Sequence, residues 1–258
     1  MSALPPALSS SLPTANELDV YFEERDRRAE VLKCKLGATV GGLWIPGPLY
    51  WLRYVMGDQG CQPGVITFDK HSQEKGTSPY PRFPGPDTHP YLPWLFGLFA
   101  NHRRVFIPKS REMMASWCGV GFCMWTCQFF PASEAIVQTQ TEDKVIDLIK
   151  GVDAPGYARA LYEGQPKWLQ NRYKLARPMK EQSQREITWE NHSVIRGVPS
   201  GADQVRQYHP TLVMFDEAAF LSEFKSSYGS ADLVASKIIA VSSAGPGWFA
   251  DVCSEETA

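Results

Sequence analysis

The feature that most constrains the fold is a series of short apolar segments that alternate with helical segments from residue 104 onward. Strands are expected at 104–108, 135–139, 186–189, 193–197, 211–215 and in a last segment that begins at 236. Helices are expected between them at 116–129, at 142–150 and, with interruptions, at 156–173. Strands bounded by helices form a largely parallel sheet that is buried on both faces. The sequence therefore predicts an α/β fold with a central, mostly parallel sheet flanked by helices.

The chain before residue 104 has a different texture, with many Pro, Gly, Ser and aromatic residues. Residues 1–15 are rich in Pro, Ser and Ala, and we expect them to be disordered because such segments bury too little apolar surface. Asn16 can cap a helix that runs to about Leu36. From 37 to 93, Pro and Gly interrupt the chain so often that we expect few long elements, apart from a short helix near 91–101.

Composition limits the number of domains and the kind of partner. The 258 residues, 43% of them hydrophobic, suffice for one large domain with a small appendage. We therefore divide the chain into an N-terminal extension, 1–64, partly disordered and with one helix, and a main domain, 65–258. Because the formal net charge is −2, contact with DNA requires a local basic patch. Six basic residues form either such a patch or an ordinary solvated face: Arg159, Lys167, Arg172, Lys174, Arg177 and Lys180.

No segment has the sequence of a membrane anchor or of a metal site built from cysteines. The most apolar stretch, 113–130, is shorter than the roughly 20 apolar residues of a bilayer span, and we interpret it as a buried helix of a soluble core. The N-terminus lacks a basic region before an apolar run, so no signal peptide is expected. The six cysteines include no CxxC pair, and we expect small buried thiols in a reducing cytoplasm.

A basic loop lies between the strand at 104–108 and the apolar helix, in the segment FIPKSREMMASW. A phosphate-binding loop needs this strand–loop–helix context, and its usual pattern is GxxxxGK[ST]. With Ser116 at the hydroxyl position, Ala115 stands where the lysine is usual, Lys109 stands first in the loop, and Met114 replaces the second glycine. Lys109 and the planar fork of Arg111 are suited to phosphate oxygens. A basic loop with an ordinary helix cap is the alternative.

Two carboxylates end the next diagnostic strand, in the segment TLVMFDEAAF. In P-loop enzymes the aspartate at this position, here Asp216, holds the Mg²⁺ shell, and an adjacent glutamate, here Glu217, orients or deprotonates the attacking water. Two charges at the end of a buried strand are costly unless a ligand engages them. The alternative is a strand that ends in a solvated acidic turn.

A third strand, in KIIAVSSAGPGWF, ends in Ser242 and Ser243. In helicase-like motors a Ser/Thr-rich loop here senses the γ-phosphate, whereas the alternative is a plain strand-to-turn exit. Together, three apolar strands deliver polar residues at their carboxyl ends, where an open α/β sheet binds its ligand. The order of phosphate loop, acidic pair and serine-rich loop favours nucleotide hydrolysis.

These segments resemble those of the large terminase subunits of tailed bacteriophages. KSREMMASW is similar to their lysine-first Walker A motif, FDEAAF to their Walker B motif, and SSAGPG to their coupling motif. The approach PYPRFPGPDTHPYLPWLFGLFANHRRVFIP also resembles the family's aromatic and proline-rich lead-in. The resemblance spans roughly 65–250. Met114, where the family often has Gly, and Glu112, where it often has Gln, are departures that concern the geometry of the loop.

The resemblance implies a P-loop NTPase of the additional-strand, RecA-like class that binds ATP and Mg²⁺. Ser116 and Asp216 would hold Mg²⁺, and Glu217 and Arg111 would act in catalysis. Arg206, in the polar turn SGADQVRQYH shortly before Walker B, would be an arginine finger donated to a neighbouring subunit. Residues expected to bind ATP are Lys109, Ser110, Arg111, Met113, Met114, Ala115, Ser116, Ser242 and Ser243. Tyr91 and Trp94 either stack on the adenine or belong to the core.

The function implied by the resemblance is ATP hydrolysis that powers translocation of double-stranded viral DNA into a procapsid. The implied partners are DNA, the portal protein, the small terminase subunit and further copies of the chain in a ring, with a monomer expected in isolation and no membrane. The implied location is the host cytoplasm, with transient docking on the procapsid. The family's nuclease domain is not expected in this chain. A helicase-like ATPase that remodels nucleic acid or protein is the alternative, and a non-enzymatic fold would show no ATP turnover.

Overall fold

The computed structural model describes residues 15–55, 64–65, 82–111 and 113–255, with side chains from residue 19 onward. Six strands form one sheet in the order β3-β8-β7-β4-β6-β5. They are β3 (Arg104–Lys109), β4 (Glu134–Gln138), β5 (Glu186–Thr188), β6 (Val194–Val198), β7 (Leu212–Asp216) and β8 (Lys237–Ser243). The α/β prediction is confirmed, and every expected strand is present within about two residues of its expected bounds. The exposed edge strand β5 differs from its neighbours, since it runs antiparallel to β6.

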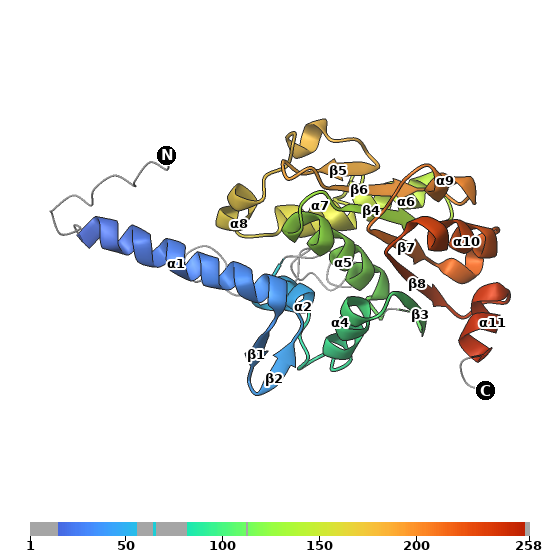
Figure 1. Cartoon of the computed structure of the whole chain (residues 1–258), viewed down its shortest axis with the longest axis horizontal. Coiled ribbons are helices and arrows are strands. Elements are labelled where there is room, and N and C mark those ends of the chain that lie inside the picture. Colours follow the sequence, from blue (N-terminus) through green and yellow to red (C-terminus); the bar gives the residue numbers. More distant parts are fainter. Residues whose placement is uncertain (1–14, 56–63, 66–81, 112, 256–258) are drawn as a thin grey trace, which may run out of the picture.

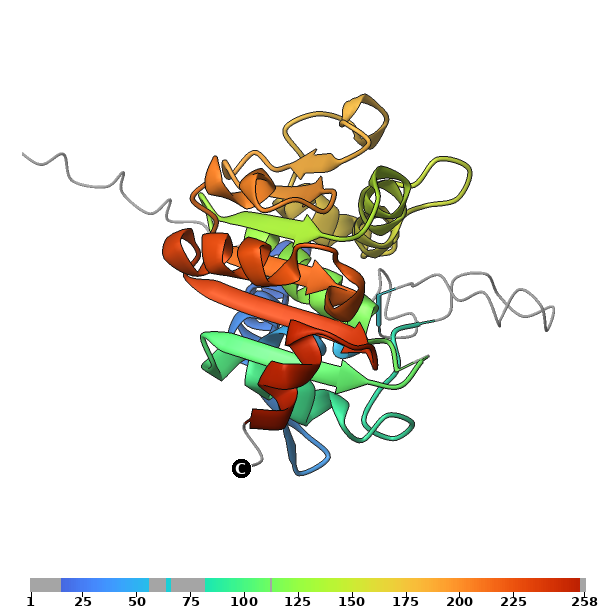
Figure 2. The same ribbon diagram turned by 90° about the vertical axis from the view of Figure 1, so that its right-hand side faces the viewer.

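Strand β8 lies between β3 and β7 and pairs with both in parallel. One strand thus separates the strand before the basic loop from the strand that ends in Asp216, which is the arrangement of the additional-strand class. The parallel strands end at the same edge of the sheet, as the arrowheads in Figure 2 show.

The sheet is buried on both faces, which explains the continuous apolar runs in its strands. Leu212 and Met214 of β7 belong to one hydrophobic cluster, whereas Val213 and Phe215 belong to a second. Alternation follows from the two-residue period of a strand, which directs successive side chains to opposite faces. Strand β8 divides its residues between the two clusters in the same way.

Helices cover the two faces (Figure 1). Those that contribute to the first cluster are α1 (Ala15–Leu36), α2 (Gly47–Tyr54), α4 (Leu92–Asn101), α5 (Ala115–Phe129), α6 (Glu142–Ile149), α7 (Tyr157–Glu163) and α8 (Lys167–Arg172). Those on the other face are α9 (Asp203–Arg206), α10 (Phe224–Val234) and α11 (Trp248–Glu255). Two 3₁₀ turns, η2 (Met179–Glu181) and η3 (Ala218–Phe220), complete the elements after β4. None of the described helices is long and apolar enough to cross a membrane.

The expected apolar helix is confirmed as α5, which packs on β4 and β7. Gly119 allows this close approach, because a Cβ there would lie 2.4 Å from Cε of Met214. Cys118, Cys123 and Cys127 of α5 are buried free thiols, and so is Cys34, as expected, whereas the expectation is wrong for Cys253 of α11, which is only partly buried. Cys61 lies outside the described residues.

The N-terminal part contains more regular structure than expected. Helix α1 (Ala15–Leu36) projects from the body, and its end meets α2 (Figure 1). The expectation of irregular chain is wrong for residues 38–54, which form the hairpin β1 (Ala38–Val40) and β2 (Leu43–Ile45) followed by α2. Pro48 lies in the first turn of α2, where its missing N–H costs no hydrogen bond, so it starts this helix instead of breaking it.

One helical expectation is confirmed, and one expectation on local structure needs correction. The segment expected to be helical with interruptions at 156–173 forms α7 and α8, with residues 164–166 between them. The polar turn expected around Arg206 is the short helix α9, whose Val205 is buried in the second cluster. The expected disorder of residues 1–14 lies outside the described residues, as do residues 79–81 at the start of the lead-in.

Candidate nucleotide-binding site

The three polar segments predicted to converge are brought together at the carboxyl edge of the sheet. In the parallel register, Lys109 at the end of β3 lies opposite Ser243 at the end of β8. Asp216 at the end of β7 lies opposite Val241, which precedes Ser243 on β8 by two residues. The phosphate loop, the acidic pair and the serine pair are therefore neighbours because their strands are neighbours, although up to 134 positions separate them in the chain.

Ser116 and Asp216 form the first pair of the site. The Ser116 hydroxyl, in the first turn of α5, donates a hydrogen bond of 2.6 Å to Oδ1 of Asp216. Asp216 is only 7% exposed. Burial raises the pKa of its carboxyl above the ordinary value, and the Ser116 hydrogen bond and the nearby lysines only partly oppose this. The favourable contacts of the Asp216 carboxylate therefore do not fully offset the cost of its burial.

The donor chemistry of this pair fits Mg²⁺, which prefers oxygen ligands and is usually held by one or two carboxylates together with phosphates. Ser116 and Asp216 supply a hydroxyl and a carboxylate next to a basic loop. Among the described residues no group of three His, Cys, Asp or Glu side chains forms a cage. A cation held jointly by these two residues and a phosphate ligand is therefore the arrangement that the residues fit.

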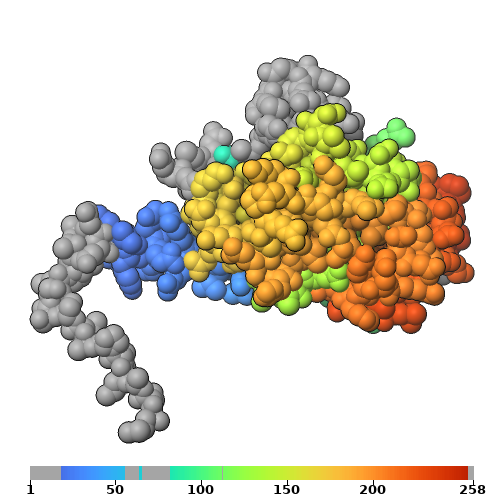
Figure 3. All heavy atoms as spheres, turned by 90° about the horizontal axis from the view of Figure 1, so that it is seen from above, coloured from blue at the N-terminus to red at the C-terminus, as the bar shows by residue number. Residues whose placement is uncertain are grey.

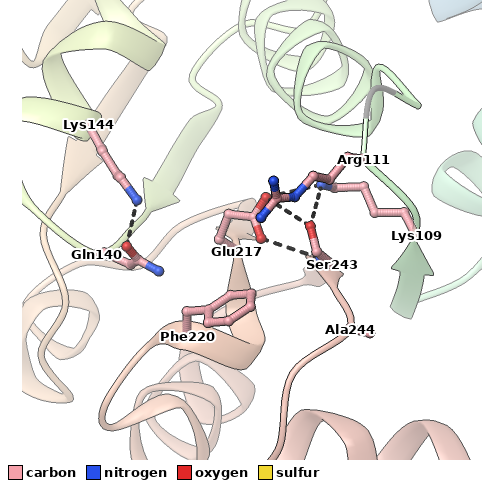
Figure 4. A pocket seen from close by; sticks show the side chains of 8 residues that line it. All are labelled: Lys109, Arg111, Gln140, Lys144, Glu217, Phe220, Ser243 and Ala244. Atoms are coloured by element: carbon pink, nitrogen blue, oxygen red, sulfur yellow. Dashed lines mark hydrogen bonds and ion pairs between the residues drawn. The ribbon is translucent and has the colours of Figure 1, made fainter.

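Lys109 and Glu217 form the second pair (Figure 4). The Lys109 Nζ donates to Glu217 Oε1 at 3.0 Å and to the Ser243 Oγ at 3.4 Å. The Ser243 backbone N–H donates to Glu217 Oε2 at 3.3 Å. Partial burial acts to raise the pKa of Glu217, but the hydrogen bond and charge of Lys109, with the Ser243 hydrogen bonds, outweigh it and hold that pKa below its ordinary value. Glu217 is therefore ionised at neutral pH.

A cavity of about 480 Å³ opens beside this pair. Lys109, Arg111, Glu217 and Ser243 line it, as the sequence predicted. Sequence reasoning missed four other lining residues: Gln140, Lys144, Phe220 and Ala244. Figure 4 shows Gln140 and Lys144 on the side of the cavity away from Lys109. Gln140 and Lys144 follow β4, so the rule that located the other residues, polar side chains after a strand end, applies to them too.

The lining of the cavity carries more positive than negative charge. Lys144 donates a 2.5 Å hydrogen bond to Oε1 of Gln140, and among the described residues neither Lys144 nor Arg111 pairs with a carboxylate. The Lys109 charge is shared with Glu217. An anion with several charges, such as a polyphosphate, would complement these three cations.

The loop before α5 carries a strained residue where the usual motif has glycine. Met114 has φ 49° and ψ 13°, a left-handed conformation that glycine adopts without a steric cost. A residue outside the loop holds the preceding turn, because the Tyr91 hydroxyl donates a hydrogen bond of 3.0 Å to the carbonyl of Met113. Tyr91 thus supports the loop backbone, whereas Trp94 is 65% exposed and belongs to no core. Ser110 is exposed, Ala115 is buried at the start of α5, and Glu112 is not described.

Two other predicted residues, Ser242 and Arg206, do not line the cavity. Ser242 is fully buried, and its Oγ accepts a 3.0 Å hydrogen bond from the N–H of Ala219, so it ties β8 to η3. Arg206 is exposed on α9, where it pairs with Asp203 at 3.3 Å, and it does not line the cavity. The ion pair with Asp203 is the structural alternative for Arg206.

Comparisons with known proteins give a likeness in fold. No family model matches the chain, and no curated protein matches it. The solved ATPase domain of the Thermus phage P74-26 large terminase is 14% identical, over 72% of this chain and 74% of that one, with a TM-score of 0.41. The HK97 bacteriophage large terminase is 8% identical, over 77% of this chain and 37% of that one, with a TM-score of 0.47.

A third similar structure, the large terminase of a thermophilic bacteriophage in complex with ADP, is 13% identical over 57% of this chain and 35% of that one, with a TM-score of 0.37. The chain is similar in fold to the ATPase domains of phage large terminases. At these identities and TM-scores the likeness concerns the fold, and the residues of the site are assigned from their own geometry.

Proposed function

We propose that this chain binds ATP with Mg²⁺, hydrolyses it, and thereby drives translocation of double-stranded viral DNA into a procapsid, as the ATPase domain of a large terminase subunit. One observation carries the proposal. Two pairs, Ser116–Asp216 and Lys109–Glu217, lie at the carboxyl edge of an additional-strand sheet. Beside them is a cavity whose lining carries three cations. These are the groups that phosphoryl transfer to water requires.

In this proposal each residue has a distinct task. Lys109 and Arg111 bind the phosphates, since both line the cavity from the basic loop. Ser116 and Asp216 hold Mg²⁺, which neutralises phosphate charge when bound. Glu217 is already ionised at neutral pH, as a base must be, and it accepts a proton from the attacking water.

The ion pair of Lys109 with Glu217 has a consequence for this mechanism. The Lys109 side chain is only 9% exposed, and its ammonium group donates to Glu217. A bound phosphate competes for the same ammonium group, because both are anionic acceptors at hydrogen-bond distance. Binding of ATP therefore releases Glu217 toward water while Lys109 turns to the phosphate.

Lys109→Ala tests this proposal. The variant should lose ATP hydrolysis in the assembled motor and keep the wild-type circular dichroism spectrum, because it removes a phosphate ligand and little of the core. Lys225→Ala, at an exposed position of α10, is the matched control and should retain full turnover. Wild-type turnover in Lys109→Ala would show that Lys109 is not the motor lysine. Absence of turnover in wild type under all motor conditions would favour the non-enzymatic alternative.

The remaining part of the proposal concerns assembly. The resemblance suggests a ring of this subunit on the portal, with the small terminase subunit and DNA as further partners, in the host cytoplasm at the procapsid. Packaging of duplex DNA by the reconstituted motor distinguishes this from the helicase-like alternative. Strand separation without packaging would support the alternative instead.

A further inference from the structure

A strongly basic segment lies away from the nucleotide cavity. Residues 167–185 hold six Lys or Arg side chains and one carboxylate, that of Glu181, which gives a net charge of +5 in a chain whose total is −2. The segment runs from α8 to the edge strand β5 and forms part of the face turned to the viewer in Figure 3, in yellow and orange. Such a concentration of positive charge is typical of a surface that binds a polyanion.

Part of this charge is compensated within the protein, and part is not. Arg172 pairs with Glu24 of α1 at 3.1 Å, and Arg185 pairs with Glu142 of α6 at 3.2 Å. Lys174, Arg177 and Lys180 are exposed and form no ion pair among the described residues. We call residues 174–185, all of which are described, the basic platform.

Buried hydrogen bonds hold the backbone of the basic platform. The Gln182 side chain is buried, donates to the carbonyls of Arg177 at 2.8 Å and Thr188 at 3.3 Å, and accepts from Thr188 Oγ1 at 3.0 Å. The ammonium of Lys150, a residue only 7% exposed, donates to the carbonyls of Gln182 at 2.5 Å and Lys180 at 3.3 Å. Burying a lysine costs free energy unless its ammonium group is hydrogen-bonded, and here the hydrogen bonds of Lys150 hold the backbone of the loop.

The same helix reaches both the basic platform and the nucleotide cavity. Lys144, in the first turn of α6, lines the cavity, and Lys150 caps the other end of α6. An eight-residue helix is a stiff connection. The two ends of one short helix therefore contact the cavity and the basic platform.

We propose that the basic platform binds the phosphate backbone of duplex DNA, an assignment that rests on the proposed function. Residues 174–185 contain no aromatic side chain, whereas proteins that bind single strands rely on aromatic rings for base stacking. They also offer mainly polar and charged side chains at the surface, whereas the core of a protein interface is depleted of charge. Cations on a rigid backbone suit duplex phosphates, which are regularly spaced and need no base contact.

The test is the salt dependence of duplex binding by the full chain, measured by fluorescence anisotropy with a labelled duplex. Each phosphate contact contributes about 0.9 to the slope of log affinity against log salt. The triple variant Lys174→Ala, Arg177→Ala, Lys180→Ala should lower the slope by up to about 2.7. The control triple variant Lys33→Ala, Lys35→Ala, Lys225→Ala also takes the formal charge from −2 to −5 and should keep the wild-type slope.

An unchanged slope in the platform variant, or an equal loss in the control, overturns the proposal. So does tighter binding of a single strand than of the duplex, or binding of polyglutamate in place of DNA. Binding of Mg²⁺-ATP, measured on the same samples, should be unchanged in both variants. If wild type binds no ATP, the proposed function fails, while the slopes still decide whether the platform binds DNA.

Discussion

Asp216 and Glu217 are adjacent in the chain, yet their surroundings shift their pKa values in opposite directions. Asp216 ends a strand that is buried on both faces, and burial raises its pKa. Glu217 adopts a left-handed conformation, with φ 52°, and its side chain meets Lys109, which holds its pKa low. Neighbouring titratable groups whose surroundings push their pKa values apart are typical of functional sites.

Glu217→Gln is the first prediction at this scale. The amide keeps the size of the side chain and can still accept a hydrogen bond from Lys109, so ATP binding should persist. Turnover should fall at least about a hundredfold, because the general base is lost. Single-turnover hydrolysis and equilibrium binding of ATP separate the two effects. Turnover at the wild-type rate would assign the base to another residue.

Asp216→Asn is the second. A carboxyl whose folded-state pKa is raised contributes stability at low pH, and this contribution is lost as pH rises through the folded-state pKa. At pH values above that pKa, the ionised carboxylate of Asp216 therefore destabilises the folded protein. Asp216→Asn should melt at a higher temperature than wild type at pH 7 in EDTA, and should lose the stabilisation that Mg²⁺-ATP gives wild type. A lower melting temperature for Asp216→Asn in EDTA would contradict the cost assigned to this carboxylate.

At the scale of elements, the contact between α6 and β6 depends on a glycine. A Cβ at Gly197 would lie 2.4 Å from Cγ1 of Val145 and 2.9 Å from Cγ1 of Ile149, and both neighbours are β-branched and stiff. The helix that lines the cavity and holds the basic platform can therefore lie close to the sheet only because this side chain is absent.

Gly197→Ala should destabilise the fold by about 1–3 kcal/mol, the usual cost of overpacking. Gly229→Ala is the matched control, since nothing lies within 4 Å of its Cβ position in α10. An alanine inside a helix is favoured over glycine by about 1 kcal/mol, so this control should be at least as stable as wild type. Urea denaturation of both variants provides the comparison, and equal stability of the two would argue against the close contact.

At the scale of the whole molecule, Arg206 lies on the surface, outside the lining of the cavity. Its side chain is 62% exposed, and its ion pair with Asp203, itself 87% exposed, contributes roughly 0–1 kcal/mol and is easily broken. The resemblance assigns this position to a finger that completes a neighbour's site. The isolated chain should then be a weak ATPase and a monomer.

Mixing subunits tests this assignment in the packaging motor. Arg206→Ala subunits keep their own Glu217, and Glu217→Gln subunits keep their arginine, so a mixture should recover part of the hydrolysis that each lacks alone. The control replaces the Glu217→Gln subunits with the double variant Arg206→Ala, Glu217→Gln, which supplies no arginine and should give no recovery. If the first mixture also stays inactive while assembly is confirmed, the finger does not act in trans.

The sequence by itself determined the strands and the residues that end them. Lys109, Asp216, Glu217 and Ser243 were located because local apolar runs specify strands, and parallel strands direct their carboxyl ends to one edge. This reasoning was wrong at two places. Pro48 starts α2 instead of breaking it, because the effect of Pro on a helix depends on its position in the element. The segment expected to be a polar turn forms the short helix α9.

Only the tertiary structure decided which of these residues share a cavity and how they pair. The order of strands brought Lys144 to the same cavity as Arg111, and the pleat turned Ser242 toward η3 while Ser243 met Glu217. The rigidity of the basic platform likewise depends on Lys150, 30 residues from the carbonyl of Lys180 that it holds. Such contacts arise from register and from packing between segments distant in the chain, and no local pattern of residues encodes them.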